Sequence, residues 1–322
     1  MSDAPLQPID LSRVRTFPVA RRSHKVDAGR LAGVPDAGAR FGDWLASLPD
    51  FLGVTELRAA VEAVVAARRA DRPVVMALGA HVVKVGCSPV VIDLMRRGVV
   101  TALALNGATA IHDVELALFG ETSEEVADTI RDGRFGMVRE TPEFFAAALA
   151  AGRARGLGAA LGAALRSQSA PHGELSLLRT AAELSLPATV HVALGTDTIH
   201  MHPQVDPGAL GEASGVDFRL ACAVVAGLGA GDAGGAGGVW CNVGSAALLP
   251  EVFLKAVSVA RNLGHNLDAM HTLNLDMQRH YRPQQNVIGR PVAPGHGHEL
   301  IGQHEILLPL LRQAVVESLA AR

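Results

Sequence analysis

Two short apolar runs, each followed by a loop and a helical pattern, constrain the fold more than any other feature of the chain. Residues 73–78 (PVVMAL) and 99–105 (VVTALAL) carry no charge, and each leads, within residues 79–115, into small and polar residues and then a helix-like segment. Uncharged runs that alternate with helices are typical of buried strands in a parallel sheet. Ligands of such sheets bind beyond the carboxyl ends of the strands, so residues 79–88 and 106–109 are the first candidates for a functional site.

Local signals predict a helix after each of these strands. Ser88 is expected to cap a helix over residues 90–97, and residues 110–119 are expected to form the next one. Thr122 and Glu125 then have the spacing of a capping box, in which two side chains each satisfy a free backbone N–H group. They predict a further short helix.

The alternation of strand and helix patterns continues toward the C-terminus. Further strands are expected over residues 189–194, 239–242 and 267–275, with helices between them, and the glycine-rich stretch 229–238 is expected to be a flexible connection. This order predicts an α/β fold, a doubly wound and mostly parallel sheet with helices on both faces. Residues 1–40, which mix prolines with charges, are expected to form an N-terminal arm, and residues 41–322 a single α/β domain.

Composition excludes several classes of partner. The formal net charge of −3 provides no basic field for nucleic acid. The apolar runs are too short to cross a bilayer, and the first forty residues lack the apolar core of a signal peptide. The three cysteines form no CxxC pair, which favours a reducing compartment. We therefore expect a cytoplasmic protein that binds a small molecule, and neither nucleic acid nor membrane.

Four loops of similar composition are expected to meet at the carboxyl edge of the sheet: residues 80–88, 106–109, 195–202 and 242–245. Free backbone N–H groups and helix N-termini favour anions, so these loops suit the phosphate groups of a nucleotide. The alternative is that small residues only permit tight turns. The GxGxxG fingerprint does not follow the first strand, which disfavours a standard Rossmann interpretation.

Individual side chains in these loops suggest chemistry. Asp197 follows the third strand. A carboxylate at this place can accept hydrogen bonds from ribose hydroxyls, and the alternative is that it caps a helix. Lys84 is one of only three lysines and lies in one of the loops expected at the carboxyl edge of the sheet. A lysine at such a place can hold phosphate or form an imine, and the alternative is that its side chain lies in solvent. His112 is a candidate acid or base, although its neighbour Asp113 is equally explained by the helix dipole.

His200 and His202 lie two residues apart, so on an extended segment they share a face and suggest metal-assisted hydrolysis as an alternative function. Further ligands would come from His191 or from the group His296, His298 and His304. The spacing matches no standard zinc site, so no metal ligand is assigned. Both histidines of the pair also remain candidates for proton transfer in a reaction without metal.

The segment GAHVVKVGCSPVVIDLMRRGVVTALALNGATAIHDVE, together with PATVHVALGTD, resembles the deoxyhypusine synthase family. The resemblance implies an NAD-binding, Rossmann-like doubly wound fold, a transferase activity, and a homotetramer with cofactor and substrate between paired subunits. By position it implies that the cofactor is bound by Ala80, His81, Val82, Lys84, Asn106, Gly107, Ala108, Thr109 and Asp197, to which the fourth rim loop adds Asn242, Gly244 and Ser245.

The chain departs from that family where the substrate is handled. The family carries its aminobutyl group on a lysine, and the best-matching position here is Arg290, which is always protonated and so cannot be the nucleophile. Ile111 and His112 replace paired glutamates, and His202 replaces an aspartate, which predicts a poorer site for a cation. We expect an NAD-dependent, transferase-like enzyme acting on an amine or a related small substrate. The alternatives are the metal-assisted hydrolase and a non-catalytic nucleotide-binding oligomer.

Overall fold

The computed structural model describes residues 6–229 and 235–321, so residues 230–234 of the expected glycine-rich connection lie outside it. Contacts divide the chain into two units, Met1–Phe51 and Leu52–Arg322. The described part of the first unit contains two 3-10 turns, η1 (Val19–Arg21) and η2 (Ala28–Arg30), and a helix, α1 (Phe41–Ser47), and none of these elements buries a residue. The assignment of residues 1–40 to a separate arm stays a prediction.

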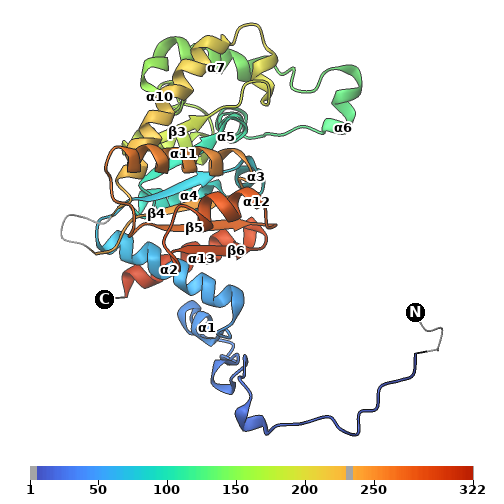
Figure 1. Ribbon diagram of the computed structural model, residues 1–322. Helices are drawn as coiled ribbons and strands as arrows, with labels where there is room; N and C mark the ends of the chain where they lie inside the picture. The colour runs from blue at the N-terminus through green and yellow to red at the C-terminus, as the bar shows by residue number, and fades with distance from the viewer. Residues whose placement is uncertain (1–5, 230–234, 322) are drawn as a thin grey trace. The chain divides into compact units, whose positions relative to one another are not determined.

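The second unit is built on a six-stranded sheet in which every paired neighbour is parallel. The strand order is β3-β2-β1-β4-β5-β6, and Figure 1 shows helices on either side of the sheet. The strands are β1 (Val74–Leu78), β2 (Ala102–Asn106), β3 (Ala188–His191), β4 (Val239–Val243), β5 (His271–Asp276) and β6 (Gly297–Ile301). The doubly wound α/β prediction is therefore confirmed.

The strand order is also that of the Rossmann fold, whose order reverses between β1 and β4. The missing GxGxxG fingerprint disfavoured a standard Rossmann interpretation, although the strand order is the Rossmann one. The fingerprint describes one phosphate-binding turn, whereas strand order depends on how the buried strands and their crossovers pack. Only β6, an edge strand with polar residues such as His298 and Glu299, was absent from the prediction.

Helices cover both faces of the sheet. They are α2 (Leu52–Arg69), α3 (Ala80–Lys84), α4 (Ser88–Arg96), α5 (Gly107–Phe119), α6 (Val126–Thr129), α7 (Glu140–Gly152), α8 (Leu157–Ser167), α9 (Leu177–Leu184), α10 (Pro207–Ala226), α11 (Leu248–Asn262), α12 (Tyr281–Pro283) and α13 (His304–Ala320). Alternate side chains of β1, β2 and β4 pack with α10 and α11 in one continuous core. Within that core Trp240 stacks on Phe253 with ring centroids 4.6 Å apart. None of the described helices is long and apolar enough to cross a membrane.

Three local predictions need correction. Helix α4 begins at Ser88, so Cys87 occupies the N-cap and the buried Ser88 hydroxyl has no partner among the described residues. Helix α5 begins at Gly107, earlier than expected, because the Asn106 side chain accepts a hydrogen bond from the Thr109 N–H group. The capping box is not formed, since Glu125 caps α6 alone and the Thr122 hydroxyl is used elsewhere.

Candidate functional site

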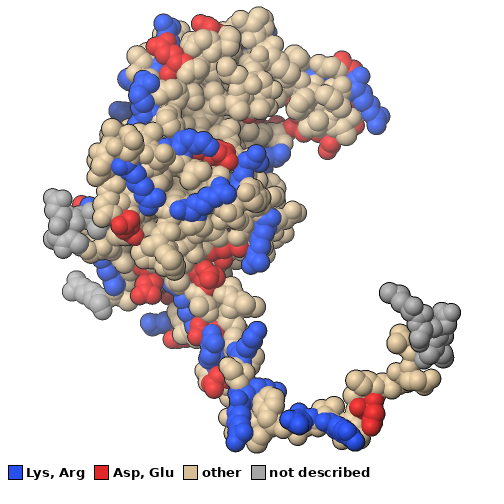
Figure 2. Space-filling view, viewed as in Figure 1, with Lys and Arg blue, Asp and Glu red and all other residues tan. Residues whose placement is uncertain are grey.

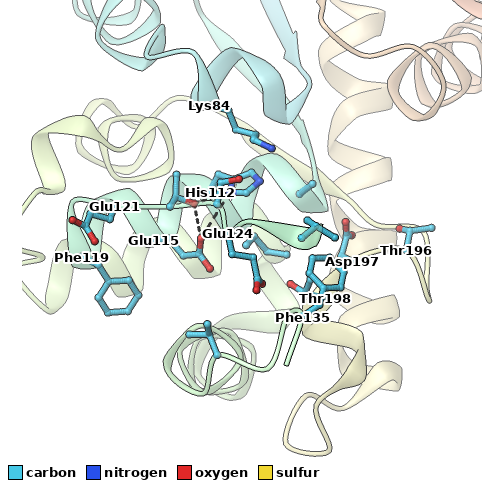
Figure 3. A pocket seen from close by; sticks show the side chains of 16 residues that line it. Lys84, His112, Glu115, Phe119, Glu121, Glu124, Phe135, Thr196, Asp197 and Thr198 are labelled. Carbon is cyan, nitrogen blue, oxygen red and sulfur yellow. Dashed lines mark hydrogen bonds and ion pairs between the residues drawn. The ribbon is translucent and has the colours of Figure 1, made fainter. Parts of the chain in front are cut away.

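A pocket of about 520 Å³ opens where the chain leaves β1, β2 and β3. Its lining includes Lys84 at the end of α3, three residues of the first turns of α5, and Asp197 in the loop after β3. The segment between α5 and α7, which includes α6, forms the opposite wall (Figure 3). The polar lining residues are Lys84, His112, Glu115, Glu121, Thr122, Ser123, Glu124, Thr196, Asp197 and Thr198. The fold thus brings Lys84, His112 and Asp197 together.

Close packing at the start of α5 positions the Asp197 carboxylate. A Cβ atom added to Gly107 would lie 2.0 Å from Asp197 Oδ2, so only glycine permits this approach. The side chain of Asp197 is 9% exposed, and burial raises the pKa of its carboxyl, although the charges of His200 and His112 act in the opposite direction. Asp197 is therefore a buried acid whose carboxylate lies against the first residue of α5.

His200 supports the loop that carries Asp197. Its Nδ1 accepts hydrogen bonds from the N–H groups of Gly195, at 2.9 Å, and Asp197, at 3.3 Å, so the neutral ring carries its proton on Nε2. That Nε2 is buried, lies 4.0 Å from Asp197 Oδ2 and has no hydrogen-bond partner among the described residues. His202 instead lies with Nε2 2.8 Å from the Gly136 carbonyl.

The histidine pair therefore does not form a metal site of the expected kind. His200 and His202 make separate contacts, and neither lines the pocket. Within the described ranges 6–229 and 235–321, no group of three or more histidine, cysteine, aspartate or glutamate side chains is arranged to hold a metal ion. The geometry gives the metal-assisted alternative no third ligand.

A hydrogen-bonded chain of side chains lies along one wall of the pocket. His112 Nδ1 is 2.6 Å from Thr122 Oγ1, and the Thr122 hydroxyl donates to Glu115. The Thr141 hydroxyl donates to the other Glu115 oxygen, at 2.9 Å. Burial raises the pKa of Glu115, but the nearby His112 and the hydrogen bonds from Thr122 and Thr141 outweigh it and leave the pKa below the usual value. Glu115 is therefore ionised at neutral pH.

The pocket is acidic, which sequence reasoning missed. Glu115, Glu121, Glu124 and Asp197 line it against the single cation Lys84, a formal charge of −3 with histidine neutral. In Figure 2 acidic side chains gather beside the hollow under the α6 segment. The prediction of a poorer site for a cation considered only Ile111, His112 and His202, the positions at which acidic residues of the deoxyhypusine synthase family are replaced. Glu121 and Glu124 come from the GETSEE segment after α5, and the cluster of acidic residues in that segment could have indicated an acidic pocket from the sequence.

Lys84 is the free cation of this site. It is exposed at the last position of α3, and it makes no hydrogen bond or ion pair among the residues that the structure describes. Its side chain extends toward the space beside His112 (Figure 3). An unpaired ammonium group within an acidic pocket is available to a ligand.

The residues expected to bind a nucleotide divide into two groups. At the point where strand order reverses, a Cβ atom on Gly79 would lie 1.9 Å from the Gly244 carbonyl oxygen, so the loops after β1 and β4 nearly touch. Asn242 Nδ2 donates to Asn274 Oδ1 and to the Ser245 carbonyl, at 2.8 and 3.0 Å. This leaves Asn242 Oδ1 and Asn274 Nδ2 buried without partners among the described residues. Orphaned polar atoms at strand ends fit a bound polar ligand.

The second group surrounds the N-terminus of α5. Asn106 Oδ1 accepts from the Thr109 N–H group at 2.8 Å, and the buried Thr109 hydroxyl lies 2.9 Å from the Leu78 carbonyl. These two side chains are therefore used to join α5 to the sheet. The N–H groups of Gly107 and Ala108 belong to the first turn of α5, where a helix offers no internal acceptor, and the Asp197 carboxylate lies against the same turn.

Ala80 and His81 begin the short helix α3 rather than an open loop. Val82 is fully buried there, and the His81 ring meets the buried His304 ring edge-on, with centroids 5.6 Å apart. Burial lowers the pKa of His304, and neither of its ring nitrogens has a normal hydrogen bond to the described residues.

Asp113 and Arg290 lie outside the pocket lining. Asp113 is fully buried and accepts from the Ser176 hydroxyl and from the N–H groups of Leu177 and Leu178, so it caps α9. Arg290 is exposed, with Nη1 3.0 Å from Asn286 Oδ1. Asp113 is thus structural.

No protein-family model matches the chain, and no curated protein matches it either. Among solved structures, the ternary complex of AgrE with ornithine and NAD+ superposes with a TM-score of 0.54 and 13% identity, covering 83% of this chain and 34% of AgrE. The chain thus spans about a third of the length of AgrE.

Two further structures share the fold. A putative deoxyhypusine synthase from Entamoeba histolytica gives a TM-score of 0.52 at 10% identity, covering 89% of this chain and 96% of its own. A conserved putative LOR/SDH protein from Methanococcus maripaludis S2 gives 0.50 at 13% identity, covering 83% and 70%. At such identities the likeness shows a common fold.

Proposed function

We propose that the protein is an NAD-dependent enzyme that acts on a small amine-bearing substrate in the acidic pocket. The observation that carries this proposal is the placement of four carboxylates, Lys84 and His112 beside the carboxyl edge of a sheet with Rossmann strand order. A protonated amine is attracted to a site of net negative charge. The proposal is supported at the level of fold by the neighbours named above, one of which was crystallised with ornithine and NAD+.

The residues at the strand ends fit a dinucleotide. The orphaned Asn242 Oδ1 and Asn274 Nδ2 need polar partners, and the first turn of α5 suits a phosphate. We assign Asp197 to the ribose hydroxyls and Gly107 and Ala108 to phosphate. NAD supplies a hydride acceptor for a carbon next to nitrogen or oxygen.

The remaining side chains act on the substrate. Glu121 and Glu124 attract and orient its ammonium group, and His112 carries a proton. Lys84 binds an anionic group or, once it has lost a proton, adds to a carbonyl carbon with loss of water to form an imine. His200 positions the loop of Asp197 through backbone contacts rather than touching the substrate.

The test has two parts. Calorimetry of the pure protein with NAD measures cofactor binding, and incubation with NAD and candidate polyamines follows the absorbance of reduced cofactor and the product mass. We expect Asp197→Asn to weaken NAD binding about tenfold, the loss of one charged hydrogen bond. Glu212→Gln removes an exposed carboxylate paired with Arg153 and serves as the matched control. The proposal fails if the wild-type protein gives no heat with NAD.

A second candidate is a nucleotide-binding oligomer without catalysis. It is favoured by the exposed position of Arg290, where the family that this sequence resembles carries its reactive lysine. Binding of NAD without turnover of any amine, by both the wild-type protein and Arg290→Lys, would support this candidate over the enzyme.

A further inference from the structure

The chain of hydrogen bonds that ends at His112 constrains which of its ring nitrogens carries the proton. His112 and Glu115 lie one turn apart on α5, Thr122 comes from the segment after that helix, and Thr141 comes from the first turn of α7. The side chains of His112 and Glu115 are 16% and 17% exposed, so water competes weakly for these bonds. Figure 3 shows the bonds between His112, Thr122 and Glu115 as dashed lines beside the pocket.

Counting protons along the chain fixes the direction of each bond. The Thr122 hydroxyl has one proton, and it is donated to Glu115. Glu115 is ionised and only accepts, receiving Thr122 on one oxygen and Thr141 on the other. Thr122 Oγ1 must therefore accept from His112, so neutral His112 carries its proton on Nδ1 and leaves Nε2 with a free lone pair.

The free nitrogen belongs to the pocket. His112 is one of the residues that line it, and Nε2 makes no hydrogen bond within the described part of the chain. The nearest acid to the ring is Glu115, with Oε2 3.8 Å from Nδ1. If Nε2 takes up a proton, the resulting imidazolium faces a carboxylate that is already ionised and held in place.

We propose that Thr122 and Glu115 are positioning residues that hold His112 in its Nδ1–H tautomer, so that Nε2 is the proton acceptor of the pocket. In the reaction, which rests on the proposed function, a substrate ammonium group gives one N–H proton to Nε2. The products are a neutral amine and an imidazolium ion, and no bond of Thr122 or Glu115 is broken. A neutral amine releases a hydride from the adjoining carbon far more readily than an ammonium ion does.

Thr122 and Glu115 would have a purely structural role if their hydrogen bond only attached the segment after α5 to that helix. Three variants distinguish this structural role from the positioning of His112. Thr122→Val keeps the size of the side chain but removes the hydroxyl, and Thr122→Ser restores a hydroxyl with less packing. Thr141→Val removes a neighbouring hydroxyl from Glu115 but leaves the bond between Thr122 and His112, and it is the matched control.

The experiment is long-range ¹⁵N NMR of histidine ring nitrogens in the full-length protein at about pH 8, above the ordinary histidine pKa. The His112 signals are assigned by their loss in His112→Gln. We expect protonated Nδ1 and unprotonated Nε2 in the wild-type protein, a mixture of tautomers in Thr122→Val, and the wild-type pattern in Thr122→Ser and Thr141→Val. Unprotonated Nδ1 in the wild-type protein, or no change in Thr122→Val, overturns the proposal.

A kinetic readout links the tautomer to the reaction. We expect Thr122→Val to lower turnover about 10- to 100-fold, a part of the usual contribution of acid–base catalysis, with unchanged affinity for NAD and recovery in Thr122→Ser. Equal turnover in Thr122→Val and wild type contradicts the role in proton transfer. The NMR result needs neither cofactor nor substrate, so failure of the tautomer assignment is distinguished from failure of NAD binding in calorimetry.

Discussion

The contact between α8 and the edge strand β3 provides a test of the packing that positions the loop after β3, which carries Asp197. Gly158 lies in the first turn of α8, and a Cβ atom there would lie 2.1 Å from the Ala188 carbonyl oxygen at the start of β3. The obstacle is backbone, so Gly158→Ala forces the helix and the strand apart. The same region is joined by Asp217, whose Oδ2 accepts from the N–H groups of Gly158, at 2.9 Å, and Val190, at 2.8 Å.

The expected cost follows from these contacts. Overpacking a tight contact costs about 1–3 kcal/mol of unfolding free energy. Burial raises the pKa of Asp217 to about 7, so its carboxyl is partly protonated at neutral pH, and weakening its hydrogen bond to Gly158 costs about 0.5–1.5 kcal/mol. Alanine in place of glycine in a helix returns up to about 1 kcal/mol. We therefore expect Gly158→Ala to lower the free energy of unfolding by about 1–4 kcal/mol.

Urea unfolding at equilibrium measures this difference, and α10 provides a matched control. Gly211 has open space where its Cβ would be placed and lies within a helix, so Gly211→Ala is expected to be neutral or to stabilise by up to about 1 kcal/mol. The reasoning is refuted if Gly158→Ala unfolds at the wild-type urea concentration or above it.

Three further predictions concern burial and charge. Burial lowers the pKa of His191 to about 4, so the folded state prefers the neutral ring. The unfolded chain binds a proton at this histidine below a pKa of about 6.5. The contribution of His191 to the free energy of unfolding is therefore full above pH 6.5 or so and is lost as the pH falls toward about 4. Urea unfolding between these values should show a smaller loss of stability in His191→Gln than in wild type, and equal losses would contradict the assignment. Asp113→Ala leaves three donors at the start of α9 unpaired and should cost about 3–5 kcal/mol, more than Asp113→Asn; equal unfolding midpoints would show that Asp113 is not a cap. Glu121→Gln with Glu124→Gln should weaken binding of a diamine about tenfold in calorimetry, with less dependence on salt, and an unchanged affinity would place the amine elsewhere.

The sheet was largely predictable because its strands are buried on both faces. Val74–Leu78 and Ala102–Asn106 lie almost where the apolar runs place them, since burial allows few polar residues there. The edge strand β6 alternates buried and partly exposed residues and carries His298 and Glu299, so no apolar run marks it. Element boundaries moved where a side chain made a bond that spacing does not reveal, as Thr122 does with His112.

The site was predictable only in part, because it depends on contacts between distant segments. Lys84, His112 and Asp197 were found since each follows a strand, and parallel strands end at one edge. The hydrogen bond between Thr122 and Glu115 was not predicted, because the segment after α5 folds back onto that helix. His200 and His202 were assigned to one face of an extended segment, but residues Thr198–Met201 form a 3-10 turn that separates them.

The most direct test of the account is calorimetry of NAD with the pure wild-type protein, followed in the same sample by addition of a diamine and measurement of reduced-cofactor absorbance. We predict stoichiometric binding of NAD and then formation of reduced cofactor that Lys84→Met and His112→Gln diminish. Absence of heat with NAD would contradict the assignment of this pocket. So would formation of reduced cofactor by both variants at the rate of the wild-type protein.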